Sequence, residues 1–328
     1  MTKVCVSEVI QAELRDPLGV EPTQDVLSAA AKEAVDLAHA AFDKRDPAAV
    51  DHAERLLYTV HAQHSFAPPL QGIASTIWPI LMRAKLRGVF ALVDAPKELD
   101  DDAMTRALNG AVQRADEQDH SFLDEIASAE SLDGLVLYTR NWYGSTHGFT
   151  TQLFSLTQRC NGVARLYPVF KACLENVYEE FEKVAHPAMR ARWPKRIGLD
   201  YSVEQSLSEP DQLTESFALQ NFRTGVCSLN DPTYGLGSFF SIEAAFPGVC
   251  RRMYPNLKRR GFGDEDIATF KVHDATDEDH AAEFMTALRA SELTPTDRAK
   301  VVRGALAQME VRHQMFEAMR ARLRRSQR

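Results

Sequence analysis

The sequence predicts an all-α protein, and three observations favour this fold class. Apolar residues recur at helical spacing along most of the chain, whereas the alternating pattern of strands is nearly absent. The breaks between these periodic segments coincide with proline, glycine or asparagine–glycine pairs. The length of 328 residues and the hydrophobic fraction of 45% suit a globular protein with a large core.

The first 130 residues form what we interpret as an N-terminal helical extension. Prolines at positions 22 and 47 mark the starts of two helices, and Pro68–Pro69 ends the second. The segment after this break is apolar, but Arg83, Lys85 and Arg87 make it too polar for a membrane span. We expect helices over residues 22–44, 47–64 and 70–93, and a polar amphipathic helix from about residue 96.

Residues 131–328 show a denser helical pattern, which we assign to a second domain. Thr294 is a candidate N-cap, with Pro295 at the first helical position and Asp297 in the first turn. Six or seven helices in this region predict a helical bundle. Their expected bounds are 134–160, 164–193, about 209–226, 234–260, 264–291 and 294–325.

Composition limits the cellular context and the partners. The net charge of −8 argues against non-specific binding of nucleic acid. Five cysteines without C-x-x-C spacing suit free thiols in a reducing compartment. Neither a signal core nor a membrane span is present in the sequence, so we expect a cytoplasmic protein. Phosphate loops, nucleophile elbows and H-E-x-x-H motifs are also absent from the sequence.

The segment 273–280 places three metal-binding side chains on one helix face. His273, Asp277 and His280 are spaced i, i+4 and i+7, which confines them to a sector of about 60°. A solvated acidic face is the alternative, but Phe270 and Phe284 share the sector and turn it inward. Buried charges need partners or a metal. Three other acids fit the solvated face: Asp274, Glu278 and Asp279.

A second pair, Glu179 and His186, shares one helix side about ninety residues earlier. The neighbouring Glu180 and Glu182 are alternatives, because a run of charges is usually a solvated face. We favour Glu179 because it lies on the same side as His186. Pro187 leaves the continuity of this helix open.

Glu243 is the third feature, a lone acid in the apolar segment SFFSIEAAFPGV. A salt bridge to Arg251 or Arg252 is the structural alternative, but those residues lie two turns away. A bridging metal ligand explains Glu243 better. Three histidines and three carboxylates together form a set that binds a pair of iron or manganese ions inside a helical bundle.

These segments resemble the haem-oxygenase-like di-iron oxidases and oxygenases. The resemblance covers about residues 135–328 and rests on YTRNWYGSTHGF, LENVYEEFEKVAHP, SIEAAFPGVCRRMYPNLKRRGF and VHDATDEDHAAEF. It implies a seven-helix haem-oxygenase-like bundle that binds two irons rather than haem and uses O₂ as co-substrate. Some members supply one further carboxylate ligand, which the sequence does not place. The ligands that the resemblance implies are Glu179, His186, Glu243, His273, Asp277 and His280.

The resemblance leaves the substrate open. Characterised members oxygenate nitrogen or cleave C–C bonds, and the same scaffold hosts metal-free enzymes of thiamine and quinone-cofactor metabolism. We favour N-oxygenation of a small amine to a hydroxylamine, nitroso or nitro product in biosynthesis, with an external electron donor. The alternatives are oxidative C–C cleavage or desaturation of an amino or fatty acid, and a non-catalytic helical scaffold.

The expected pocket mixes aromatic and polar groups, which suits a small polar or aromatic amine better than a long alkyl chain. By analogy with N-oxygenating members, the N-terminal extension is expected to support a homodimer. His147 is also readily explained as a core histidine. The expected pocket residues are Trp142, Tyr143, His147, Phe239, Phe240 and Phe246.

Overall fold

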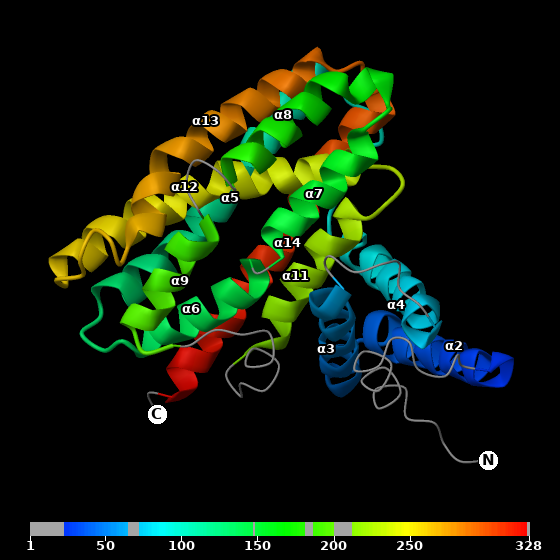
Figure 1. Cartoon of the computed structure of the whole chain (residues 1–328), viewed down its shortest axis with the longest axis horizontal. Helices are drawn as coiled ribbons and strands as arrows, with labels where there is room; N and C mark the ends of the chain where they lie inside the picture. The colour runs from blue at the N-terminus through cyan, green and yellow to red at the C-terminus, as the bar shows by residue number, and fades with distance from the viewer. Residues whose placement is uncertain (1–22, 65–71, 147, 181–185, 200–211, 327–328) are drawn as a thin grey trace.

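The computed structural model describes residues 23–64, 72–146, 148–180, 186–199 and 212–326 (Figure 1). Within these ranges the regular structure is helical throughout and contains no strand, which confirms the predicted fold class. The elements are α2 (Gln24–Ala38), η1 (His39–Asp43), α3 (Pro47–His64), α4 (Gly72–Phe90), α5 (Asp101–Ser128), α6 (Asp133–Thr146), α7 (Phe149–Cys160), η2 (Ala164–Leu166), α8 (Tyr167–Tyr178), α9 (His186–Arg196), α11 (Thr214–Cys227), α12 (Thr233–Arg259), α13 (Ala268–Ala290) and α14 (Pro295–Ser326).

The prediction of a single helix over residues 134–160 is wrong, because the structure has two helices there, α6 and α7. Gly148 lies outside the helical region of the backbone at φ −93° and ψ 9°, and its carbonyl accepts the first hydrogen bond of α7 from Gln152. The expected helix over 164–193 corresponds to α8 and α9, and residues 181–185 lie outside the described ranges.

The predicted start of the last helix is confirmed. The Thr294 hydroxyl accepts a hydrogen bond from the Asp297 amide at 3.1 Å, and the Asp297 carboxylate accepts one from the Thr294 amide at 3.1 Å. This reciprocal arrangement is a capping box, and Pro295 occupies the first helical position. The cap fixes the point at which α14 enters the bundle.

Helix α12 runs through the middle of the bundle and packs most extensively against α13, α14 and α5 (Figure 1). Helix α8 covers α13 and α7, whereas α11 lies between α14 and α3. The helices α2, α3 and α4 gather at one end of the molecule (Figure 1). Helix α5 precedes residue 130 yet packs along α12 and α14, and the domain boundary at residue 130 stays a prediction.

Two glycines let α12 and α14 approach until their backbones touch. A Cβ atom on Gly237 would lie 1.7 Å from the Val301 carbonyl oxygen, and one on Gly304 would lie 2.0 Å from the Tyr234 carbonyl oxygen. Any larger residue would therefore push the two helices apart. This crossing sets the distance between the side chains that α12 and α14 direct into the bundle.

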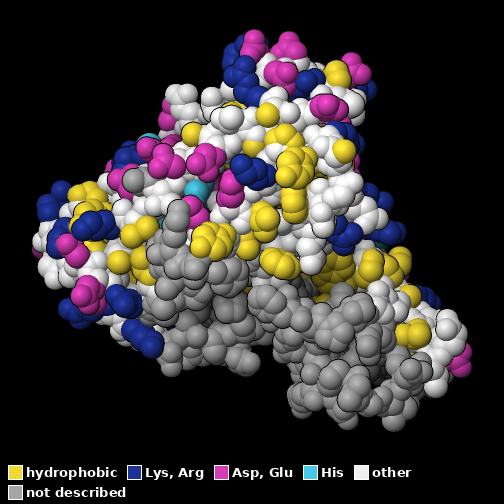
Figure 2. Space-filling model, turned by 45° about the horizontal axis from the view of Figure 1, so that its top comes forward, with side chains coloured by type: hydrophobic (Ala, Val, Ile, Leu, Met, Phe, Trp, Pro, Cys, Tyr) yellow, Lys and Arg dark blue, Asp and Glu magenta, His cyan; other side chains and the backbone are white. Residues whose placement is uncertain are grey.

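The visible surface carries acidic and basic side chains interspersed, with apolar side chains gathered in a band between them (Figure 2). Exposed large hydrophobic residues on α7 and α8 include Phe154, Tyr167, Leu174 and Tyr178. Every helix within the described ranges is too short or too polar to cross a bilayer.

We predict that Gly237→Ala lowers the free energy of unfolding by about 1–3 kcal/mol or more, because the new methyl group overlaps the backbone of α14. Gly110→Ala is the matched control. Its Cβ would meet nothing closer than the Arg114 side chain at 3.6 Å, so the better helix former should stabilise the protein by about 0.5–1 kcal/mol. Urea unfolding followed by circular dichroism measures both, and equal stability of the two variants would contradict the close crossing.

Candidate metal centre

The polar stripe of α13 faces inward, as the sequence predicts. Its three members, His273, Asp277 and His280, are each at least 94% buried. Glu243 projects from α12 toward the stripe and is 3% exposed. The π-helical residues that follow α8 bring Glu179 to the same place. Carboxylates from three segments thus converge on the imidazoles of α13.

The centre of the cluster consists of Glu243, Asp277 and His280. One ligand atom from each of these residues lies within 4.8 Å of the others. Both ring nitrogens of His280 face carboxylates, with Nδ1 at 3.2 Å from Glu243 Oε2 and Nε2 at 2.9 Å from Glu179 Oε2. This spacing suits a single small cation held between the donors.

The protonation of His280 follows from these contacts. Burial lowers its pKa, but the hydrogen bonds and charges of Glu243 and Glu179 outweigh burial and raise the pKa to about 9. The imidazolium is therefore the cation that compensates the carboxylates near neutral pH. A metal ion that binds there must take over this role and displace the proton.

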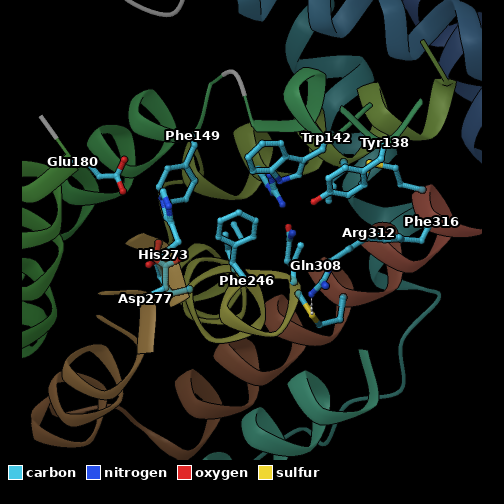
Figure 3. Close-up of a pocket in the computed structure, with 17 residues that line it drawn as sticks. Tyr138, Trp142, Phe149, Glu180, Phe246, His273, Asp277, Gln308, Arg312 and Phe316 are labelled. Atoms are coloured by element: carbon cyan, nitrogen blue, oxygen red, sulfur yellow. Dashed lines mark hydrogen bonds between the residues drawn. The ribbon is translucent and has the colours of Figure 1, made fainter. Parts of the chain in front are cut away.

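His273 is oriented differently, in the way typical of a metal-ligating histidine. Its Nδ1 donates a hydrogen bond to the Thr269 carbonyl oxygen at 2.6 Å, which leaves the lone pair on Nε2. The ring stands edge-on to Phe246, with centroids 5.2 Å apart. His273 and Asp277 border a cavity of about 60 Å³, which also reaches Glu180 (Figure 3).

Glu180 is a site residue that the sequence analysis set aside in favour of Glu179. The chain is π-helical at both positions, a feature frequent at functional sites. Glu179 reaches His280, and its side chain is 27% exposed, whereas Glu180 is 2% exposed and lines the cavity. The two neighbouring acids therefore both belong to the polar cluster. Glu180 is the described residue that fits the further carboxylate left unplaced by the sequence.

The sequence offered a salt bridge from Glu243 to Arg251 or Arg252 as an alternative, and neither arginine forms it. Arg251 pairs instead with Asp274 and Glu278 on the outer face of α13, and Arg252 pairs with Asp124 at 2.6 Å. The solvated role expected for Asp274 and Glu278 is thus confirmed. Both side chains are more than 40% exposed.

The cysteine near the cluster offers no thiolate. Burial first, and then the charge of Asp277, raise the pKa of the Cys250 thiol well above its ordinary value. The donors that the described residues bring together are carboxylate oxygens and imidazole nitrogens, a set that suits iron or manganese.

The predicted pocket residues are only partly brought to the cavity. Trp142 and Phe246 line it with their rings stacked at 5.4 Å. Phe239 does not, because the Phe149 ring stacks on it at 5.6 Å and takes its place at the cavity wall. Phe240 is buried in the core instead. His147 and the side chains of Tyr143 and His186 lie outside the described residues.

The sequence analysis did not predict the residues at the opposite end of the cavity. Gln308 and Arg312 reach it from α14 (Figure 3). Arg223 borders it from α11. Gln308 and Arg312 interrupt an apolar stripe of α14 at i, i+4 spacing, and this interruption is the sequence signal that could have revealed them.

Metal affinity should rise with pH because of His280. At about pH 7 the ring is protonated, so a divalent ion must displace the proton. We predict that the affinity for Mn²⁺ rises about tenfold per pH unit up to the pKa of about 9 and then levels off. Competition titrations of wild type and His280→Ala measure this slope. His120→Ala is the control variant. It removes a ring that lies beside Asp116, and its Mn²⁺ affinity should keep the pH dependence of the wild type. A wild-type affinity independent of pH would contradict the assignment.

Comparison with known proteins shows the family and the fold of this chain. The family model described as "Iron-containing redox enzyme" matches residues 136–313, more than half of the chain. A TenA homologue from Pseudomonas syringae pv. tomato str. DC3000 superposes with a TM-score of 0.55 at 12% identity, over 69% of this chain and 99% of that chain. The TenA homologue from P. horikoshii OT3 gives 0.50 at 13% identity, over 66% and 96%.

The likeness to TenA proteins shows the fold alone, and it confirms the predicted haem-oxygenase-like bundle. No curated protein matches the sequence. The family match runs from within α6 to within α14 and therefore includes every described residue of the cluster. The chain belongs to the family of iron-containing redox enzymes.

Proposed function

We propose that this chain is a non-haem di-iron oxygenase that uses O₂ to oxidise the nitrogen of a small amine. One observation carries the proposal: carboxylates and imidazoles from α8, α12 and α13 converge in a buried cluster that borders a cavity. Carboxylate and imidazole donors suit iron and manganese. Helical bundles build paired metal sites from such side chains.

Two separate metal positions are supported by the spacing of the histidines. His273 and His280 are seven residues apart, which separates their backbones by about 10 Å along the helix. His280 meets Glu243 and Glu179, whereas His273 faces the cavity with Glu180. Asp277 lies between the two histidines on α13 and would serve as a ligand beside either of them.

The described residues would bind the irons and shield the cavity in the following way. Glu179, Glu243, His273, Asp277 and His280 would hold the two irons, together with Glu180. The side chain of His186, the sixth ligand that the resemblance implies, lies outside the described residues. When bound, iron supplies the redox chemistry for reducing O₂. The rings of Trp142 and Phe246 would exclude water from the cavity.

N-oxygenation is favoured over attack on carbon by the polarity of the cavity. The mixed aromatic and polar walls would suit a small polar or aromatic amine, whose nitrogen would react beside the metals. A fatty acid would require a long aliphatic channel. The described walls carry aromatic and charged side chains instead, including Trp142, Phe246, Arg223 and Arg312.

Iron stoichiometry tests the metal centre. We expect anaerobic titration with Fe²⁺ to load two irons per chain in wild type. Asp277→Asn should weaken binding of at least one iron by about tenfold or more, because a buried carboxylate ligand is replaced by an amide. Asp274→Asn on the outer face of the same helix is the matched control and should bind iron as wild type does. Binding of well under one iron per chain in wild type would remove the oxygenase proposal.

Isotope labelling tests the reaction. With ¹⁸O₂, reduced iron and a panel of amines, we expect mass spectrometry to find label on the nitrogen of a hydroxylamine, nitroso or nitro product. Glu243→Gln should abolish the product, because Glu243 lies at the centre of the cluster. Cleaved or desaturated carbon products without labelled nitrogen would favour the competing oxidase chemistry instead. Unchanged turnover in Glu243→Gln would exclude Glu243 as a ligand.

A further inference from the structure

A continuous series of aromatic rings leads away from the metal centre. The His273 ring stands edge-on to Phe246 with centroids 5.2 Å apart, and the Trp142 indole stacks on Phe246 at 5.4 Å (Figure 3). The centroid of Phe270 lies 6.0 Å from Trp142 and 5.8 Å from a second indole, Trp193. These rings come from α6, α9, α12 and α13, so helix packing alone brings them into one series.

The outer end of the series approaches the surface through one more ring. The Trp193 side chain is fully buried, and the Phe262 ring meets it edge-on at 5.3 Å. Phe262 is only partly buried, and the Arg196 guanidinium lies 5.8 Å from the centroid of its ring. Arg196 pairs with Asp266, and its side chain is 54% exposed. A partly exposed aromatic ring therefore connects Trp193 with the protein surface.

The two indoles give this series a chemical property that phenyl rings lack. Indole is among the side chains that lose an electron most readily, whereas a phenyl ring does not do so under biological conditions. Electron transfer weakens steeply with distance, so two indoles with one ring between them carry an electron faster than a single long step. Trp142 lines the same cavity as His273 and Asp277, and it is thus the indole beside the redox chemistry that iron supplies.

Aromatic rings commonly fill helical cores, and two observations go beyond packing. The protein has three tryptophans, and two of them belong to this series, whereas Trp78 lies on α4 at the other end of the molecule. The Trp193 indole N–H donates a hydrogen bond to Thr139 Oγ1 at 2.8 Å. A hydroxyl is too weak a base to remove the indole proton, so an oxidised Trp193 would remain a cation that readily takes an electron back.

We propose that Trp142 and Trp193 form an electron-transfer path that protects the iron centre when O₂ is reduced and no substrate is oxidised. Each step moves one electron inward and breaks no bond. Trp142 supplies the iron centre, Trp193 restores Trp142, and an external reductant such as ascorbate or a thiol restores Trp193. The inference rests on the iron centre of the proposed function and adds to N-oxygenation a role that requires no amine.

Oxidation mapping of the three tryptophans tests the path. Hydrogen peroxide is added, without amine or reductant, to metal-free protein and to Fe²⁺-loaded protein freed of unbound iron. Peptide mass spectrometry then quantifies hydroxytryptophan and N-formylkynurenine. In metal-free protein, exposure sets the order, so the partly buried Trp78 should be oxidised several-fold more than the fully buried Trp193. Iron should reverse this order, because the oxidising equivalents then arise inside the protein. An order that iron leaves unchanged would overturn the proposal.

A variant that keeps an aromatic ring assigns the first step to Trp142. In iron-loaded Trp142→Phe, oxidation of Trp193 should fall several-fold, because the electron must then cross from Phe246 to Trp193 without an indole between them. Trp78→Phe is the matched control and should leave oxidation of Trp193 as in wild type. Circular dichroism checks that both variants are folded. Undiminished oxidation of Trp193 in folded Trp142→Phe would exclude Trp142 from the path.

The external reductant tests the protective role. With ascorbate present, iron-loaded wild type should accumulate several-fold less oxidised Trp193 and keep its iron through more additions of peroxide. Trp193→Phe should lose most of this benefit, since the ring that remains cannot pass the electron on. Equal benefit from ascorbate in wild type and Trp193→Phe would show that the reductant reaches the centre by another route.

The path and the N-oxygenase fail separately. Oxidised Trp193 in an iron-loaded protein that labels no amine nitrogen would support the path and remove the N-oxygenase. Labelled nitrogen together with an intact Trp193 would do the reverse. A protein that binds no iron would remove both.

Discussion

The burial of carboxylates from several helices around His280 is the constraint on which the rest of the structure depends. A carboxylate taken out of water costs several kcal/mol of free energy unless a partner compensates it, on the order of the penalty for any buried ion. His280 provides this compensation by contacting Glu243 on one side and Glu179 on the other. The same contacts connect α8, α12 and α13. A metal that replaced the proton of His280 would hold these helices together more strongly, so that binding and folding are coupled.

Helix α12 connects this charged cluster to the opposite end of the cavity. It directs Glu243 toward α13, and through Gly237 it touches the backbone of α14, which carries Gln308 and Arg312. Because packed helices cannot slide independently, the crossing fixes the distance between the acidic end and the guanidinium end. The cavity is therefore a product of helix packing rather than of any flexible loop among the described residues.

The fold itself does not determine the reaction. TenA homologues share this bundle at 12–13% identity, and such a likeness carries no information about chemistry. What places this chain among iron-containing redox enzymes is the family match, and what makes the match physically reasonable is the buried donor set. The exposed acids of the same helix, Asp274 and Glu278, show the contrast, because they pair with Arg251 at the surface.

The sequence by itself determined the helical class, the inward stripe of α13, the isolated acid at Glu243 and the cap at Thr294. Each of these depends on spacing along one helix, which is a local property. The sequence favoured Glu179 and missed Glu180, and it could not divide α6 from α7 or find Arg312. Those features depend on how helices cross and rotate against one another, and a one-dimensional pattern does not contain that information. Only the tertiary structure decided that Glu179 meets His280 while Glu180 lines the cavity, that Phe149 rather than Phe239 lines it, and that a guanidinium held by Asp119 borders it.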